Sequence, residues 1–126
     1  MYATLKLKKR YIVFRLSTPK ENSQTNGNQS VSKKDVEAGL FSFFLKFFGE
    51  YGYSELFYKL LQYDEKDKLG LMRCERGSLY KILGALALVE NLNGKRARII
   101  AIGVSGTIKT LKEKGFTFIK NPSFAN

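Results

Sequence analysis

The amino-acid sequence predicts one α/β domain in which an antiparallel sheet carries two helices on the same face. Its 126 residues suit a single core. Hydrophobic residues make up 44% of the chain, which is enough to build that core. Segments in which apolar residues alternate, as they do in strands, are separated by segments in which apolar residues recur at helical spacing.

The first predicted strand covers residues 10–17, whose apolar residues are mostly β-branched or aromatic. Residues 19–30, which include Pro19 and Gly27, are polar and predict a loop. Because successive side chains of a strand point to opposite faces, the even-numbered residues should face the core and the odd-numbered ones should face away. We expect Ile12, Phe14 and Leu16 to point inward, and Tyr11, Val13 and Arg15 to point outward.

A long helix is expected after the loop, with Ser32 as its N-cap and Asp35 at its third position. Gly49 and Gly52 should end it. One apolar stripe runs along this helix and consists of Val36, Leu40, Phe43, Phe44 and Phe47.

Three further apolar residues, Phe41, Leu45 and Phe48, widen this stripe beyond what one core face requires. The extra width indicates either deeper burial or a surface for a partner. The sequence alone leaves both interpretations open.

A hairpin and a second helix account for the middle of the chain. Residues 56–64 and 69–75 predict two paired strands joined by a turn at 65–68. A helix is expected over residues 78–91, with Ser78 as its N-cap. The apolar face of this helix would consist of Leu79, Ile82, Leu83, Leu86 and Val89.

The last part of the chain predicts a strand over residues 95–102, a glycine-containing turn over 103–106 and a third helix over 106–114. The tail after Gly115 has no clear pattern. The order β-α-β-β-α-β, followed by a C-terminal helix, is the split β-α-β pattern of ferredoxin-like and RRM-like domains. We therefore expect a four-stranded antiparallel sheet with two packed helices, in one domain over residues 1–126.

The charge distribution suggests a polyanionic partner. The chain has 22 Lys and Arg residues against 11 Asp and Glu, and its net charge is +11. Residues 1–20 carry six basic residues and no acidic one, and residues 95–126 carry seven basic residues and one acidic one. Nucleic acid is favoured as the partner because each neutralised phosphate releases counterions. A charge that serves only solubility is the alternative.

Several classes of protein are disfavoured by composition. The chain has no histidine and one cysteine, Cys74, which excludes Ser/His and Cys/His nucleophilic pairs and an internal disulfide. We expect no metal bound by the protein and a reducing compartment such as the cytoplasm. No segment reaches the roughly 18 consecutive apolar residues of a membrane span.

The turn after the last strand is the best candidate for a phosphate contact. Gly103 and Gly106 allow a close approach of the backbone, and Ser105 can cap the helix that follows. A phosphate at that helix start could be joined by others along Lys109 and Lys112. A plain helix cap beside a solvated basic face is the alternative. Base stacking on the sheet is not supported, because the strand over 69–75 has no aromatic residue.

Four blocks of sequence carry a resemblance to a known family. They are KKRYIVFRL at 8–16, GLMRCER at 70–76, ALALVENLNGKR at 85–96 and IGVSGTIKTLKEK at 102–114. Together they resemble the ribonuclease P protein component 2 family, the archaeal relatives of the eukaryotic Pop-type subunits. The polar loop at 19–30 departs from the family pattern. The short C-terminus, without an acidic extension, is similar to that of archaeal members.

The resemblance implies a non-catalytic subunit of ribonuclease P, the endonuclease that removes 5′ leaders from precursor tRNA. The RNA would be the catalyst and would use magnesium ions. Protein component 3 would be the direct partner, and two such pairs would join through component 2 as a homodimer. Combined with the charge pattern, this predicts an RNA-binding set made up of Lys8, Lys9, Arg10, Arg76, Lys95, Arg96, Ser105, Gly106, Thr107, Lys109 and Lys112.

Two further functions remain as alternatives. A pure protein-assembly module would use the wide apolar stripe, with Phe41, Leu45 and Phe48 at the interface. A small hydrolase on the ferredoxin-like fold would need an Arg and an Asn close together, for which Arg10 and Asn93 are candidates by residue type only. Arg73 and Glu75 should lie on the same face of the sheet, which allows an ion pair between them. The sequence favours this structural role and an RNA contact by the arginines equally.

Overall fold

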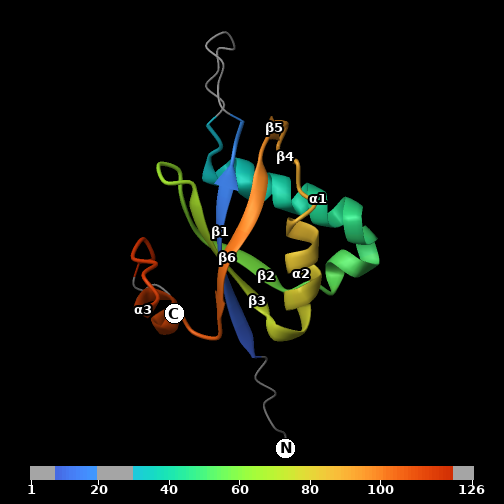
Figure 1. Cartoon of the computed structure of the whole chain (residues 1–126). Helices are drawn as coiled ribbons and strands as arrows, with labels where there is room; N and C mark the ends of the chain where they lie inside the picture. Colours follow the sequence, from blue (N-terminus) through green and yellow to red (C-terminus); the bar gives the residue numbers. More distant parts are fainter. Residues whose placement is uncertain (1–7, 20–29, 121–126) are drawn as a thin grey trace, which may run out of the picture.

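The computed structural model describes residues 8–19 and 30–120 (Figure 1). In chain order the elements are β1 (Lys9–Ser17), α1 (Lys33–Ser54), β2 (Tyr58–Asp64), β3 (Leu69–Glu75), η1 (Arg76–Ser78), α2 (Leu79–Leu86), β4 (Asn91–Leu92), β5 (Lys95–Arg96), β6 (Arg98–Ser105) and α3 (Ile108–Glu113). The label η1 denotes a 3₁₀ turn that comes directly before α2.

Four of the strands form one antiparallel sheet in the order β2-β3-β1-β6. Ile12 at the centre of β1 lies opposite Met72 of β3 on one side and Val104 of β6 on the other. The first and third of the four long strands are therefore central, as in ferredoxin-like domains. The predicted fold class is confirmed.

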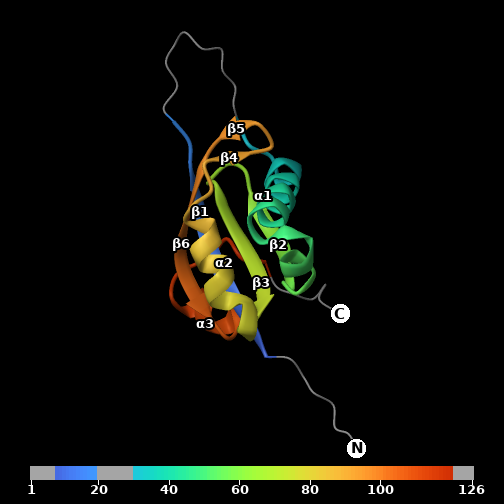
Figure 2. The same ribbon diagram turned by 90° about the vertical axis from the view of Figure 1, so that its right-hand side faces the viewer.

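Helices α1 and α2 cover one face of this sheet, as Figure 2 shows, and enclose the main core. The inward residues of β1 are completely or almost completely buried there, as predicted. Gly70 of β3 lies beneath the ring of Phe14, whose nearest atom would be 2.2 Å from a Cβ at that position. Other members of this core are Val36, Leu40, Phe44, Met72, Ile82, Leu86, Leu92 and Ile99.

The opposite face of the sheet carries a second, smaller core, which the sequence did not predict. Val13, expected to face away from the core, has no exposed surface and packs with Leu71, Leu111 and Ile119. Helix α3 and the segment after it cover this part of the sheet. The side chain of Gln62 fastens the segment: its Nε2 donates to the carbonyl of Phe118 over 2.6 Å, and its Oε1 accepts from the Lys120 N–H over 3.0 Å.

Helix α1 begins as predicted and ends later than predicted. Ser32 and Asp35 form a capping box, in which the Ser32 hydroxyl accepts from the Asp35 N–H and the Asp35 carboxylate accepts from the Ser32 N–H. Gly49, with φ of +79°, interrupts the helix, which then continues to Ser54. A left-handed backbone conformation of this kind favours glycine.

The second helix is shorter than predicted. It ends at Leu86, and Asn91–Leu92 pair with Lys95–Arg96 in a small hairpin at the Asn93-Gly94 turn. The predicted strand over 95–102 is therefore divided between β5 and β6. Gly103, expected in a turn, lies within β6 opposite Val13. The predicted loop at 19–30 and the tail after Gly115 fall largely on residues 20–29 and 121–126, which lie outside the described residues.

The β2–β3 hairpin turn forms without a glycine. The Asp64 carboxylate accepts from the N–H groups of Lys66 and Asp67, and Lys68 takes a left-handed conformation with φ of +58°. No helix among the described residues is long and apolar enough to cross a membrane.

Candidate nucleic-acid interface

Basic residues at the entrance of β1 and in η1 meet where β1 begins and β3 ends. Lys9 lies opposite Glu75, the last residue of β3. The Arg76 N–H donates to the Lys8 carbonyl over 2.7 Å, which ties η1 to the entrance of β1. The side chains of Lys8, Lys9 and Arg76 are exposed. Antiparallel pairing thus brings together cations that are more than 60 residues apart in the sequence.

The turn after β6 reaches the same end of the sheet. Ser105 lies opposite Tyr11 of β1. The Arg10 guanidinium donates to the Lys9 carbonyl over 2.9 Å, and its Nη1 would be 3.3 Å from a Cβ at Gly106. The φ of Gly106 is not in the left-handed region, so this glycine leaves room for Arg10 and is not required for a special backbone conformation.

The cap of α3 differs from the predicted one. Thr107, and not Ser105, is the N-cap, and its hydroxyl accepts from the Thr110 N–H over 3.2 Å. The Ser105 hydroxyl accepts from the Thr107 N–H over 3.2 Å. Side chains of the chain itself therefore satisfy N–H groups that were expected to be available to a phosphate. The helix has only six residues, and its start is a weaker anion site than the sequence suggested.

Two predicted lysines lie on α3, next to this turn. Lys109 is exposed, whereas Lys112 is partly buried. We define the basic end of the sheet as Lys8, Lys9, Arg10, Arg76, Ser105, Gly106, Thr107 and Lys109.

Lys95 and Arg96 lie at the other end of the sheet, because Arg98, just after them, is opposite Ser17 at the end of β1. The Lys95 ammonium is 2.7 Å from the Asp35 carboxylate and donates to the Ser30 carbonyl over 3.0 Å. Lys95 therefore holds the β4–β5 hairpin to the start of α1. Its contribution to RNA binding stays a prediction, separate from the basic end of the sheet.

Asp35 is the acceptor at the centre of this arrangement and is 9% exposed. It also accepts from the Asn93 amide over 2.8 Å. The hydrogen bond from Lys95, followed by those from the Ser32 backbone and Asn93, holds the pKa of Asp35 well below its ordinary value. Because Asn93 lies here and Arg10 lies at the basic end, the pairing needed by the hydrolase alternative does not form.

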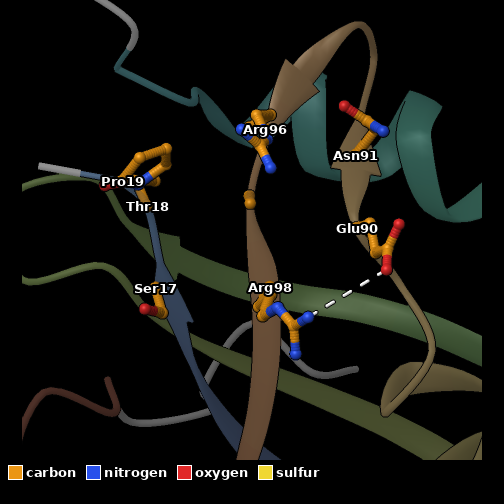
Figure 3. Close-up of a pocket in the computed structure, with 8 residues that line it drawn as sticks. Ser17, Thr18, Pro19, Glu90, Asn91, Arg96 and Arg98 are labelled. Carbon is orange, nitrogen blue, oxygen red and sulfur yellow. Dashed lines mark ion pairs between the residues drawn. The ribbon is translucent and has the colours of Figure 1, made fainter. Parts of the chain in front are cut away.

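A hollow of about 530 Å³ lies beside Arg96 and Arg98 (Figure 3). Thr18 and Pro19 line it from the β1 side, and Glu90 lines it from the other side. Arg98 and Glu90, which both line it, form an ion pair at 4.0 Å, and both side chains are largely exposed. An exposed pair of this kind contributes little to stability.

Sequence reasoning missed the residues that sheet pairing places beside the basic end. Lys59 lies opposite Arg73, and the Phe57 carbonyl accepts from the Glu75 N–H over 2.9 Å. The ion pair between Arg73 and Glu75, one of two alternatives left open by the sequence, is not among the ion pairs of the described residues. A signal was present, since residues 57–59 combine two aromatic residues and one basic residue. Only the register shows which neighbours they have.

The apolar residues of α1 divide between core and surface. Phe41 is 48% exposed, whereas Leu45 and Phe48 are partly buried and Phe48 packs against the main core. Phe47, predicted to be in the core stripe, is 50% exposed and stacks on Phe43 with ring centroids 5.6 Å apart. The exposed aromatic surface of α1 therefore includes Phe41 and Phe47.

Chemical groups for catalysis are scarce in the described parts of the chain. No group of three or more Cys, His, Asp or Glu residues there is arranged to hold a metal ion. Burial, followed by the charge of Glu75, raises the pKa of the Cys74 thiol to about 11, so the thiol stays protonated at neutral pH.

Comparison with known proteins agrees with this architecture. The family model of the Rpp14/Pop5 family matches residues 10–116, which include β2, β3, β6 and all of β1 except Lys9. The chain belongs to the Rpp14/Pop5 family. The chain is also similar to archaeal proteins named ribonuclease P protein component 2, and this similarity supports a role as a ribonuclease P subunit.

Three archaeal relatives show how far the similarity extends. Over 88% of this chain and 85% of the relative, the sequence is 36% identical to ribonuclease P protein component 2 of Pyrococcus furiosus. Identity to the Archaeoglobus fulgidus protein of the same name is 34%, over 88% of this chain and 91% of the relative. Identity to the Methanocaldococcus jannaschii protein of the same name is 32%, over 94% of this chain and 80% of the relative.

A solved structure shares the fold. One chain in the cryo-EM structure of yeast ribonuclease MRP superposes with a TM-score of 0.64 and covers 92% of this chain and 97% of its own length. The two chains are 12% identical, so this likeness concerns the fold alone.

Proposed function

We propose that this chain is a non-catalytic protein subunit of ribonuclease P that binds the catalytic RNA and supports removal of the 5′ leader from precursor tRNA. The RNA would carry out the cleavage with magnesium ions. Protein component 3 would be the direct protein partner, and a homodimer of this chain would join two such pairs, in the cytoplasm.

One observation carries the proposal: cations from distant parts of the sequence meet at the basic end of the sheet. Lys8 and Arg76 are joined through a backbone hydrogen bond, and Lys109 belongs to the helix that follows the neighbouring turn. Exposed cations on a rigid sheet end suit the regular spacing of RNA phosphates. Contacts of this kind carry no base information, so they would position the protein by RNA shape.

The test is the salt dependence of binding to ribonuclease P RNA. A variant with Lys8→Ala, Arg76→Ala and Lys109→Ala removes three exposed cations from the basic end. Each lost phosphate contact should reduce the slope of log affinity against log salt by about 0.7–0.9. A matched control with Lys33→Ala, Lys34→Ala and Lys46→Ala removes the same charge from α1.

We expect a shallower slope and weaker binding for the first variant, and a much smaller change for the control. Equal effects in the two variants would mean that only net charge matters, and the basic end would then not be the binding surface. Melting temperatures should stay close to that of the parent, because exposed lysines contribute little to stability.

A second measurement addresses the reaction. The protein by itself should not cleave precursor tRNA, whereas it should increase cleavage by ribonuclease P RNA in the presence of magnesium and component 3. Metal-dependent cleavage by RNA-free protein would contradict the non-catalytic role.

A further inference from the structure

We propose that the pocket around Phe57 binds one unpaired nucleotide of the RNA, with the base stacked on the Phe57 ring and the flanking phosphates held by Lys9, Lys59 and Arg73. This inference rests on the proposed RNA-binding function and adds a second kind of contact to it. The basic end of the sheet would recognise phosphates of any RNA, whereas this pocket would require a base free to leave its helix.

The pocket is formed by the neighbouring ends of three strands. Its volume is about 400 Å³, which lies within the range of small-molecule sites. It is lined by Lys9 of β1, by Arg73, Cys74 and Glu75 of β3, and by Leu56, Phe57, Tyr58 and Lys59 at the start of β2. Its walls thus belong to the sheet and are positioned by strand pairing.

Phe57 is the exposed aromatic of this pocket. It is 54% exposed, and its carbonyl accepts from the Glu75 N–H. Two exposed aromatics of α1 are held by ring contacts, Phe47 with Phe43 and Phe41 with Tyr53, whereas Phe57 makes no such contact within the described residues. One face of this ring is therefore available to a flat partner, and every nucleobase has such a face.

The charges around the ring favour a polyanion. Lys9, Lys59 and Arg73 contribute three positive charges, and none of them takes part in an ion pair within the described chain. Glu75 is the only acidic residue of the pocket, and its Oε1 would be 3.3 Å from a Cβ at Gly77, in the η1 turn. The acidic group therefore leans toward η1. An aromatic ring among cations is the combination that binds single-stranded nucleic acid.

The register places the pocket outside the part of the sheet that α3 covers. Arg73 shares its side of β3 with Leu71, which packs under Leu111 of α3. Lys59 is opposite Arg73 and Lys9 is opposite Glu75, so these side chains lie on the same face, beyond the second core. A base at Phe57 would therefore be close to the basic end, and one RNA strand could contact both.

The experiment uses the full chain and two probes, an oligouridine of about 12 nucleotides and an RNA duplex of similar length. Phe57→Ala should reduce affinity for oligouridine by about 5- to 100-fold, which corresponds to the loss of one stacked base. Affinity for the duplex should change by less than about twofold, because its bases are already stacked. Phe47→Ala, which removes an equally exposed ring from α1, is the matched control and should leave both affinities unchanged.

A fluorescence measurement provides an independent readout. The chain has no tryptophan, so Phe57→Trp creates a single reporter that keeps the stacking ring. We expect oligouridine to quench its fluorescence with a saturable dependence, whereas Phe47→Trp should show no such quenching. This variant also tests the pocket in case Phe57→Ala does not fold.

The outcomes separate this inference from the proposed function. If oligouridine binds but Phe57→Ala binds it as the parent does, or the Phe57→Trp signal does not change, the pocket proposal is wrong and the RNA-binding role stands. If neither probe nor ribonuclease P RNA binds the parent protein, both proposals fail. If Phe57→Ala weakens assembly with component 3 and leaves RNA affinity intact, the pocket is a protein contact and the nucleotide proposal is overturned.

Discussion

Lysine residues of this chain have different roles that depend on their neighbours. Lys95 is partly buried and makes an ion pair with Asp35, a residue 60 positions earlier, whereas Lys8 is exposed near other cations. The first arrangement stabilises the fold because the Asp35 carboxylate is largely buried and accepts several hydrogen bonds. The second leaves the charge available to a partner. Residue type alone does not distinguish them.

The role of Asp35 can be tested by measuring the stability of the Asp35→Asn variant at different pH values. The substitution should lower the free energy of unfolding at pH 7 by about 2 kcal/mol, as expected for hydrogen bonds to a charged group. Because the pKa of Asp35 is lowered in the folded state, the unfolded state binds more protons at acidic pH. The contribution is therefore fully present above about pH 5 and is lost as the pH falls through and below the ordinary carboxyl value of 3.8.

Urea unfolding at pH 7 and pH 3 measures this effect. The difference in stability between parent and Asp35→Asn should be smaller at pH 3. Glu37→Gln, an exposed position on the same helix, serves as the control and should show little effect at either pH. A difference that is the same at both pH values would show that the charge of Asp35 is not what stabilises the hairpin contact.

At the scale of elements, the β4–β5 hairpin depends on a close approach to α1. A Cβ at Gly39 would lie 2.7 Å from the Leu92 Cα, which is backbone of β4. The completely buried side chain of Leu92 belongs to the main core, so α1 and the hairpin enclose it together. Gly84 on α2 differs, because nothing lies within 4 Å of a Cβ at that position.

Alanine substitutions at Gly39 and at Gly84 should change the stability of the protein in opposite directions. Gly39→Ala should destabilise the protein by about 1–3 kcal/mol, because the backbone of β4 must move to make room for the methyl group. Gly84→Ala should stabilise it by about 0.4–1 kcal/mol, since alanine is compatible with a helix and restricts the unfolded chain. Thermal or urea unfolding of the two variants measures both. A Gly39→Ala variant as stable as the parent would contradict the close packing of α1 on β4.

At the scale of the whole molecule, the basic end of the sheet and the exposed aromatic residues of α1 lie on different layers. The cations of the basic end belong to the entrance and start of β1, to η1 and to α3, whereas Phe41 and Phe47 lie on α1, which covers one face of the sheet (Figure 2). Exposed aromatic surface of this kind is typical of protein interfaces. RNA and a protein partner could therefore bind at the same time.

This separation predicts that the two kinds of binding can be removed independently. Phe41→Asp should weaken assembly with the proposed component 3 partner by about tenfold or more, because an interface aromatic is replaced by a charge. RNA affinity and melting temperature should change little, since Phe41 is half-exposed. Thr117→Asp, an exposed position after α3, is the control for added charge.

Light scattering and titration of the mixed proteins measure this assembly. A Phe41→Asp variant that is unfolded by itself would mean that Phe41 is a core residue. An unchanged assembly would mean that the partner binds elsewhere. Either result would contradict the assignment of this surface.

The sequence by itself determined the fold class, because strand alternation, helical periodicity and the capping box of Ser32 and Asp35 are local patterns. It also identified the cations at the entrance of β1 and near α3 as candidates, since charge segregation is visible along the chain. It did not predict the burial of Val13, the pairing of Lys95 with Asp35 or the end of α2 at Leu86, because each depends on contacts between distant segments.

Tertiary structure alone decided which of these residues act together. The pairing of β1 with β3 and β6 joins Lys8 to Arg76 and Arg10 to the turn at Gly106, and the β2–β3 register places Phe57 and Lys59 beside Arg73 and Lys9. A shift of one residue in either register would move these side chains to the opposite face of the sheet. The physical reason is that a binding surface depends on which side chains share a face, and strand register determines this.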